Sequence, residues 1–215
     1  ASFCIVATGA RNSLRELGTR FRVHDVMHAL GYYVAERQEA AEIKFFPGLR
    51  GYIWIFPRTD HLSVGICGKG EPALSLRRRL EAFLQERGMR FEPSNFYAHL
   101  LPSLEPDGWD RARFGGWRWL AVGDAAGLVD PITGEGIYYA MRSGELAAEA
   151  LLETGFDPER APQRYTELLG KEFLGELEFA SRLAGRLFLG RFLGGTVPQR
   201  TIQFLHYSAR FRELM

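Results

Sequence analysis

One acidic and glycine-rich stretch carries the residue types best suited to holding a ligand. Asp124 directly follows the apolar run 119–122, and three glycines and a proline come soon after it. A carboxylate at the end of a strand can accept hydrogen bonds from ligand hydroxyls, and glycines leave backbone N–H groups bare for close approach. The stretch therefore predicts a ligand site at a strand–loop–helix corner.

A helix is predicted after this loop, with Thr133 as its N-cap. Small and apolar side chains recur there at three- and four-residue steps and are expected to share one buried face. These positions are Ile137, Ala140, Met141, Gly144, Ala148 and Leu151. A helix N-terminus carries partial positive charge, so it favours an anion or an electron-rich ring edge. The alternative is purely structural, with glycines that shape the turn and an aspartate that caps the helix.

The string from Gly123 to Ile137 resembles the second FAD-contacting motif of one flavoprotein group, which includes p-hydroxybenzoate hydroxylase and the geranylgeranyl reductases. The resemblance implies FAD as cofactor, with Asp124 as the ligand of the ribityl chain. It also implies that residues 131–137 lie against the flavin ring. The cofactor-binding positions that it implies are Gly123, Asp124, Pro131, Gly134, Glu135, Gly136 and Ile137.

A second candidate site is the aromatic segment 51–57. Its period-two pattern places Tyr52, Trp54 and Phe56 on one face of a strand. The segment 62–67 is expected to return as the partner strand of a hairpin. The aromatic face is either ordinary core or a wall for a long apolar or aromatic substrate.

The same segment resembles the substrate-side motif of geranylgeranyl reductases, in which a basic residue such as Arg58 often follows. The resemblance implies substrate-binding roles for Tyr52, Trp54, Phe56 and Pro57. Flavin-dependent halogenases carry a similar string. Tyr52 in place of their first Trp, and Phe56 in place of their Ile, favour the reductases.

The first residues predict a buried strand over 2–7 that ends in a turn. The turn resembles the Asp-Gly motif on the last strand of the group's dinucleotide-binding portion, although Thr8 stands where Asp is usual and Ser13 comes one residue late. No Gly-x-Gly-x-x-Gly unit follows a strand. The resemblance therefore implies a C-terminal portion of a larger flavoprotein, whose partner is the missing N-terminal FAD-binding portion. Without parallel neighbours, the strand is expected to pair poorly or with another copy of the chain.

The predicted fold class is α+β: a mainly antiparallel substrate-domain sheet with covering helices, plus a strand–loop–helix remnant of the FAD-binding domain. We expect four parts, namely the last strand and turn of the FAD-binding portion (1–20), the sheet domain (21–110), the flavin-contacting segment (111–155) and a helical region (156–215). Further strands are expected at 21–26, 29–34, 43–46 and 96–104. A helix is expected at 71–87, with Leu76, Leu80, Phe83 and Leu84 as its buried stripe. A second helix is expected from about 163 onward, and one face of it is made of Tyr165, Leu169, Phe173, Leu177, Ala180, Ala184 and Leu187. A turn is expected at 191–195 and a further helix at 198–214.

Composition narrows the partners and the location. A net charge of +1 gives no bulk field for nucleic acid, and the histidines show no metal-ligand spacing with Cys4 and Cys67. Two cysteines in apolar runs make a disulfide framework unlikely and fit a reducing, cytoplasmic compartment. No apolar run reaches the roughly 18 residues of a membrane span. Aromatic residues after 187 suit core packing, a lipid substrate or peripheral membrane contact, and an oligomer is left open.

The predicted function is an FAD-dependent oxidoreductase that passes hydride from reduced flavin to an apolar, isoprenoid-type small molecule. An aromatic monooxygenase or a halogenase is the alternative enzyme, because the Gly-Asp motif is common to all three. A non-catalytic substrate-domain fragment is the third hypothesis, and the chain by itself is expected to be colourless. No catalytic residue is assigned, since His61, Glu135 and Tyr138 have no argued role.

Overall fold

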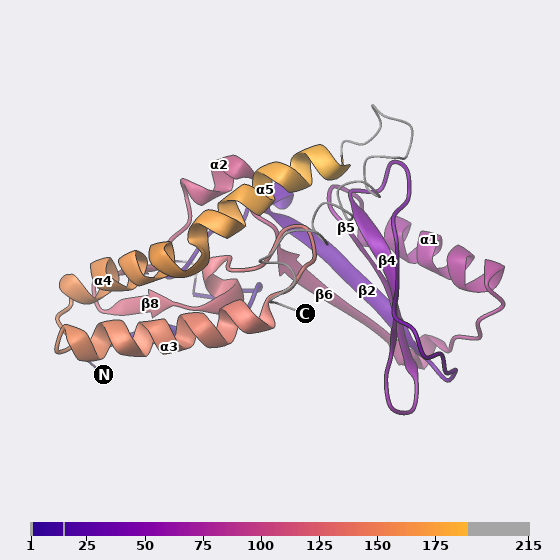
Figure 1. Cartoon of the computed structure of the whole chain (residues 1–215), viewed down its shortest axis with the longest axis horizontal. Coiled ribbons are helices and arrows are strands. Elements are labelled where there is room, and N and C mark those ends of the chain that lie inside the picture. The colour runs from indigo at the N-terminus through magenta and orange to yellow at the C-terminus, as the bar shows by residue number, and fades with distance from the viewer. Residues whose placement is uncertain (1, 15, 189–215) are drawn as a thin grey trace. The chain divides into compact units, whose positions relative to one another are not determined.

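The computed structural model describes residues 2–14 and 16–188 (Figure 1). They form two compact units of an α+β fold, as predicted. Among the described residues, the first unit combines the chain up to Met27 with Leu100–Leu183, and the second combines His28–His99 with residues 184–188. Segments far apart in the sequence therefore build the first unit together. The four-part division expected from the sequence stays a prediction.

The first unit contains a three-stranded sheet in the order β1-β8-β7, made of β1 (Cys4–Val6), β8 (Trp119–Ala121) and β7 (Gly115–Gly116). β1 pairs in parallel with β8. The expectation that the first strand would pair poorly, or only with another copy, is therefore wrong.

The prediction that β1 is buried is also wrong. Cys4 is exposed and Ile5 keeps 45% of its surface exposed, whereas Val6 is buried. The reason is that β1 is the outer strand of its sheet. An apolar run indicates only that a strand is favoured. How much of the strand is buried depends on how many strands and helices pack against it.

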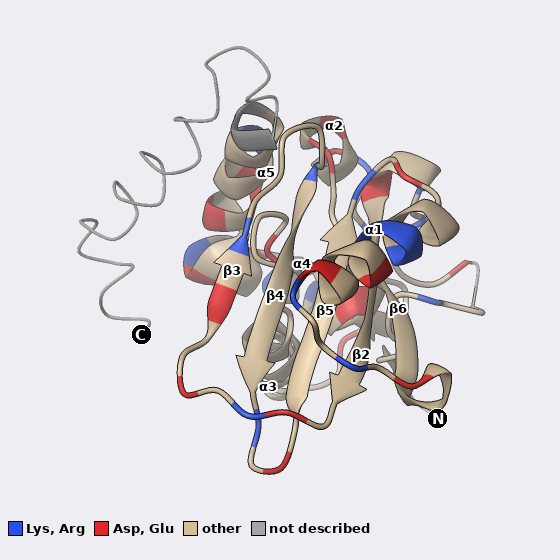
Figure 2. Ribbon diagram, turned by 90° about the vertical axis from the view of Figure 1, so that its right-hand side faces the viewer, with Lys and Arg blue, Asp and Glu red and all other residues tan. Residues whose placement is uncertain are grey.

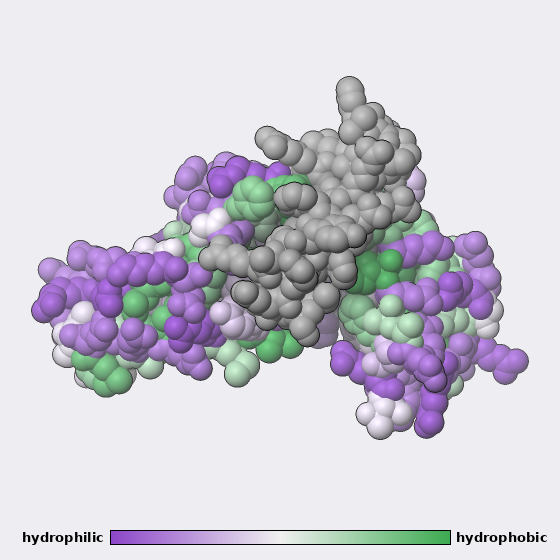
Figure 3. All heavy atoms as spheres, viewed as in Figure 1, coloured by the Kyte–Doolittle hydropathy of each residue, from purple (hydrophilic) through white to green (hydrophobic). Residues whose placement is uncertain are grey.

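Helix α3 (Ile137–Glu153) begins later and faces differently from the prediction. Its N-cap is Gly136, not Thr133. The expected inner face is largely outside, since Ile137 and Met141 are 74% and 67% exposed. The buried positions are Ser143, Leu146, Ala147, Ala150 and Leu151. The helix itself carries small and apolar side chains on most of its sides, so the spacing of such residues in the sequence could not identify the buried side. Hydrophobic surface is visible along the helix in Figure 3.

Two further helices complete the core of this unit. α4 (Arg160–Leu169) continues through a π-helical turn, Gly170–Leu174, into α5 (Gly175–Phe188). The predicted face is buried at Tyr165, Leu169, Phe173, Leu177, Ala180 and Ala184, and the side chain of Leu187 lies outside the described part. The hydroxyl of Tyr165 donates to the carbonyl of Ala121 on β8 at 2.9 Å. In Figure 1, β8 runs between α3 and α4. This hydrogen bond joins α4 to β8.

The predicted turn at 191–195 and helix at 198–214 lie outside the described residues. Of the aromatic residues expected after 187, Phe192, Phe204, Tyr207 and Phe211 also lie outside them, and the side chain of Phe188 is not described.

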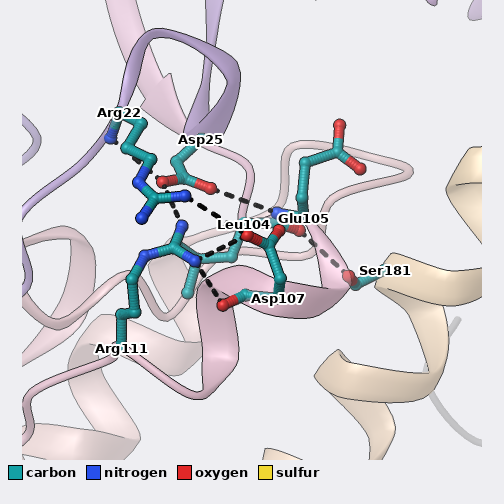
Figure 4. Close-up of polar contacts among 7 residues, drawn as sticks. All are labelled: Arg22, Asp25, Leu104, Glu105, Asp107, Arg111 and Ser181. Carbon is teal, nitrogen blue, oxygen red and sulfur yellow. Dashed lines mark hydrogen bonds and ion pairs between the residues drawn. The ribbon is translucent and has the colours of Figure 1, made fainter.

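A buried carboxylate ties the remaining segments of the first unit together (Figure 4). Asp25 is fully buried and accepts hydrogen bonds from the guanidinium of Arg111 and the backbone N–H of Arg22, both at 3.0 Å. Arg111 also pairs with Asp107 at 2.7 Å on the short helix α2 (Pro106–Trp109). The side chain of Ser181 on α5 donates to the carbonyl of Leu104 at 3.0 Å.

This network explains one wrong prediction. Residues 21–26 do not form a strand, because Val23–Asp25 is a 3-10 turn closed by the carboxylate of Asp25 on the backbone of Arg22. The strand begins only at Val26. A side chain that bonds its own nearby backbone competes with the sheet in this way.

The second unit is built on a five-stranded sheet in the order β3-β4-β5-β2-β6 (Figure 2). The strands are β2 (Val26–Val34), β3 (Glu42–Lys44), β4 (Gly51–Pro57), β5 (Leu62–Gly68) and β6 (Phe96–Pro102). The pairs β3–β4, β4–β5 and β5–β2 are antiparallel, so the predicted hairpin at 51–67 is confirmed. A second 3-10 turn, Pro93–Asn95, leads into β6.

Helix α1 (Ala73–Glu86) lies against one face of this sheet, as Figure 2 shows. Its predicted stripe is confirmed, because Leu76, Leu80, Phe83 and Leu84 are all buried. They join Ile53 and Ile55 of β4 in one core. Each such side chain contributes roughly 1.5–3 kcal/mol through burial.

Candidate functional site

The corner after β8 is held tightly against helix α3. Gly123 has a positive φ of 55°, and a Cβ atom added there would lie 2.9 Å from the Cβ of Ala140. Its backbone N–H donates to the hydroxyl of Ser143 at 2.9 Å. Any larger residue would push the helix away, so glycine is required for this approach. The 3-10 turn Gly123–Ala126 therefore has a fixed position at the start of the predicted site.

Asp124 is a half-buried carboxylate in this turn. Burial raises its pKa above the ordinary value, and only its own backbone N–H opposes that shift. Among the described residues, no other residue forms a hydrogen bond or ion pair with this side chain. A Cβ atom on Gly136 would lie 3.3 Å from its Oδ1 atom, so the carboxylate lies beside the N-cap of α3. Burying a charge without a partner is costly, and a ligand with hydroxyl donors would relieve that cost.

The loop between the turn and the helix is closed by Asp130. Its carboxylate accepts the backbone N–H groups of Ile132 and Thr133 at 2.8 and 2.9 Å. Its backbone N–H donates to the carbonyl of Glu135, and its own carbonyl accepts from Gly134, both at 2.9 Å. Asp130 was not predicted as part of the site. The signal was present, since an aspartate often bonds the backbone two residues further on and so shapes a turn.

Glu135, the residue before the N-cap Gly136, supports the first turn of α3 with its side chain. Its carboxylate accepts the backbone N–H of Tyr138 at 3.0 Å, which is one of the groups that have no partner within the helix. Pro131 is buried below the loop, whereas Ile137 is exposed beside the helix start. The structure thus brings all the predicted cofactor-contacting positions into one loop–helix corner. Their roles as flavin ligands stay predictions.

A second loop lies against the same turn. The hydroxyl of Thr19 donates to the carbonyl of Ala126 at 2.8 Å, and its backbone N–H donates to that of Ala125 at 3.0 Å. A cavity of about 730 Å³ opens along this loop. It is lined by Ala10, Arg11, Asn12, Glu16, Thr19, Arg20, Phe21, Arg22, Val23, Val26 and Leu100. Within this lining Arg20 pairs with Glu16 at 2.6 Å, and Arg22 pairs with Asp107 at 3.4 Å.

In the second unit, the aromatic side chains of β4 alternate as predicted. Ile53 and Ile55 enter the core under α1, while Tyr52, Trp54 and Phe56 lie on the opposite face. Trp54 and Phe56 are half-buried and their rings stack, with centroids 6.2 Å apart.

Sequence reasoning missed three polar or aromatic neighbours of this face, namely Tyr33, Ser63 and Tyr97. Ser63 bonds both the indole of Trp54 and the hydroxyl of Tyr97. Strand register brings them together from β2, β5 and β6, and register is hard to read from one sequence because it depends on partner strands.

The residues left without a role make ordinary structural contacts. His61 pairs with Asp60 at 2.6 Å and packs edge-on against Tyr33, and Tyr138 packs edge-on against Tyr139 and Phe173. Burial raises the pKa of the Cys67 thiol to about 11. Within the described ranges there is no group of three or more His, Cys, Asp or Glu residues that could hold a metal. No helix in the same ranges is long and apolar enough to cross a membrane.

Comparison with known proteins gives relatives for most of the chain, although no family model matches it. It is 32% identical over 214 residues to a menaquinone reductase of Mycolicibacterium smegmatis, covering 90% of this chain and 51% of that protein. It is also 32% identical over 206 residues to digeranylgeranylglycerophospholipid reductase 2 of Methanothermobacter thermautotrophicus, covering 84% and 50%. The chain spans about half the length of these relatives.

Solved structures show the same fold. A geranylgeranyl bacteriochlorophyll reductase-like protein from Thermoplasma acidophilum matches with a TM-score of 0.74 and 22% identity, over 86% of this chain and 50% of that one. A probable FAD-dependent monooxygenase from Pseudomonas aeruginosa matches with a TM-score of 0.58 and 19% identity, over 87% and 56%. At these identities the likeness concerns the fold alone.

Proposed function

Because the chain belongs to the geranylgeranyl reductase-like group of flavoproteins, we propose that it supplies the flavin-facing corner and the substrate face of an FAD-dependent oxidoreductase. The observation that carries the proposal is the half-buried carboxylate of Asp124, which lies beside Gly136 at the start of α3. That carboxylate has open acceptor positions, and a Cβ atom at position 136 would come within 3.3 Å of it.

The corner suits the flavin end of FAD. The ribityl chain carries hydroxyl donors, and Asp124 supplies an acceptor whose charge is already poorly solvated. The N-terminus of α3 places partial positive charge at the electron-rich edge of a flavin ring. Gly134, with a positive φ of 75°, and Gly136 keep the backbone bare on that side. In this proposal the chain binds and orients the cofactor, which when bound supplies hydride chemistry.

For the substrate, we propose an apolar, isoprenoid-type small molecule that contacts the face of Tyr52, Trp54, Phe56 and Pro57. Two observations support this. The face combines large apolar rings with few polar atoms, as ligand-binding surfaces do. The relatives of about one-third identity are named for reduction of menaquinone and of a digeranylgeranyl lipid.

A monooxygenase or a halogenase uses the same fold, as solved structures with TM-scores of 0.58 and 0.57 indicate. The relatives that match most of this chain at 32% identity are named reductases, which favours reduction. The product mass separates the three reactions. A reductase adds two hydrogen atoms to its substrate, a monooxygenase adds one oxygen atom, and a halogenase replaces one hydrogen with a halogen.

FAD binding by the full-length protein tests the cofactor site. Asp124→Ala removes charge-assisted hydrogen bonds worth roughly 1.5–3 kcal/mol, so FAD should bind about ten- to a hundredfold more weakly. Quenching of flavin fluorescence measures this affinity. Asp110→Ala, at an exposed aspartate of the same unit, is the matched control and should bind FAD normally. Equal affinities in the two variants would remove Asp124 from the site.

A further inference from the structure

On the sheet face opposite helix α1, a row of three paired residues across β4, β5 and β2 contains two glycines. Trp54 of β4 lies opposite Gly65 of β5, and Gly65 lies opposite Gly31 of β2. Side chains of one row point to the same face of a sheet. The two glycines therefore leave a shallow gap in the middle of this face.

Two aromatic rings fill that gap by lying flat across it. A Cβ atom on Gly65 would lie 2.1 Å from the Cζ2 atom of Trp54, and one on Gly31 would lie 2.4 Å from the hydroxyl oxygen of Tyr97. Neither glycine could carry a side chain without displacing the ring above it. The two glycines thus leave room for one ring from β4 and one from β6 over the sheet.

Two more rings pack against these at small interplanar angles. Phe56 stacks with Trp54 at 6.2 Å with 26° between the planes, and Tyr33 stacks with Tyr97 at 4.8 Å with 30°. We call these four residues, Tyr33, Trp54, Phe56 and Tyr97, the aromatic floor. Because 47% of the surface of Tyr33 is exposed, the floor can be reached from that end.

A pair of hydroxyl groups lies at the centre of the aromatic floor. The indole N–H of Trp54 donates to the hydroxyl of Ser63 at 3.3 Å, and the hydroxyls of Ser63 and Tyr97 are 2.8 Å apart. Each hydroxyl brings one proton, and only one proton can lie between the two oxygens. Among the described residues no acceptor is found for the second proton. The centre therefore has one hydrogen-bond donor to spare.

The spare donor is partly withdrawn from water. Ser63 keeps only 7% of its surface exposed, and burial raises the pKa of the Tyr97 hydroxyl, so that group stays protonated at neutral pH. A poorly hydrated donor without an acceptor costs free energy, and a ligand oxygen at this position recovers it. An aromatic surface with one central donor matches an apolar ring that bears one oxygen.

We infer that the aromatic floor binds a planar ring bearing a carbonyl or hydroxyl oxygen, a compound of the quinone class, with Ser63 and Tyr97 as specificity-determining residues. The inference rests on the proposed function and narrows its substrate class. A polyprenyl chain without a ring offers neither a plane for the rings nor an acceptor for the hydroxyl pair.

Two probes of the same shape test this on the 215-residue chain by calorimetric titration, without flavin. We expect 2-methyl-1,4-naphthoquinone to bind about tenfold more tightly than 2-methylnaphthalene, which has the same ring system without oxygens. Tyr97→Phe should reduce quinone binding to the level of the hydrocarbon, and Ser63→Ala is a second variant with the same expectation. Tyr32→Phe removes a tyrosine hydroxyl from the opposite face of β2, where it bonds Glu81, and should leave quinone binding unchanged.

Three results would overturn the inference: equal affinity for the two probes, unchanged quinone binding in both floor variants, or tighter binding of geranylgeraniol than of the quinone. None of these bears on FAD binding by Asp124. Failure of the floor and failure of the cofactor site are therefore seen separately, and circular dichroism of each variant shows whether it has folded.

Discussion

The two candidate sites are built in opposite ways. The loop–helix corner of the first unit is made mostly of backbone, in which glycines, a cap and one carboxylate lie within residues 123–137. The aromatic floor of the second unit is made of side chains, brought together from β2, β4, β5 and β6 by strand register. In the roles proposed above, the first arrangement holds a cofactor by its edges, and the second offers area to a planar ligand.

The surroundings of the two sites also differ, because one is crosslinked by polar groups and the other is apolar. A buried carboxylate, Asp25, crosslinks separate segments of the first unit, whereas the core beneath the floor is apolar and includes α1. A polar crosslink is directional and fails when one partner is lost, but an apolar core tolerates change in proportion to the volume altered. Substitutions should therefore affect the two units by different amounts.

The largest effect is expected from Asp25→Asn. The variant leaves Arg111 and two backbone N–H groups without their charged acceptor. The first unit should therefore lose about 3 kcal/mol of unfolding free energy. This is the low end of the range for a buried pair, because Arg111 is 29% exposed. Urea unfolding measures it. Asp107→Asn removes the exposed partner of the same arginine and should leave the unfolding free energy close to that of the unchanged chain. Similar losses in both variants would mean that the buried crosslink does not hold the unit.

A smaller effect is expected in the floor from Gly65→Val. The new side chain would overlap the indole of Trp54, and overpacking of this kind costs about 1–3 kcal/mol. The control is Ala98→Val at an exposed position of β6, expected within about 0.5 kcal/mol of the unchanged chain. Thermal unfolding of both variants provides the comparison. If valine at position 65 were harmless, Trp54 could not lie flat over that glycine.

The smallest effect should appear at the corner and depends on pH. Burial raises the pKa of Asp124 above 3.8, so its contribution to stability is full below that pH and is lost as pH rises through the native pKa. Asp124→Asn should therefore give a slightly higher Tm at pH 7, and the gain should vanish as pH falls toward 4. The same variant should bind FAD more weakly. A lower Tm at pH 7 would show that the carboxylate stabilises the free chain.

The sequence by itself determined what depends on neighbours along the chain. The hairpin at 51–67, helix α1 with its buried stripe, and the corner from Gly123 to Ile137 were all predicted, because alternation, helical period and glycine placement are local signals. The group resemblance also rested on such a string. In the second unit, Tyr52, Trp54 and Phe56 were placed correctly on one face for the same reason.

Only the tertiary structure decided what depends on partners. Helix α3 turned its expected face outward, because small residues surround it and packing alone chose the inner side. Residues 21–26 became a turn, because the carboxylate of Asp25 closes on Arg22 and is held in place by Arg111, far along the chain. Tyr97 lies close to Trp54 because the order of strands in the sheet brings their strands near each other. Contacts of this kind follow from which segments meet, and no period within a single segment records them.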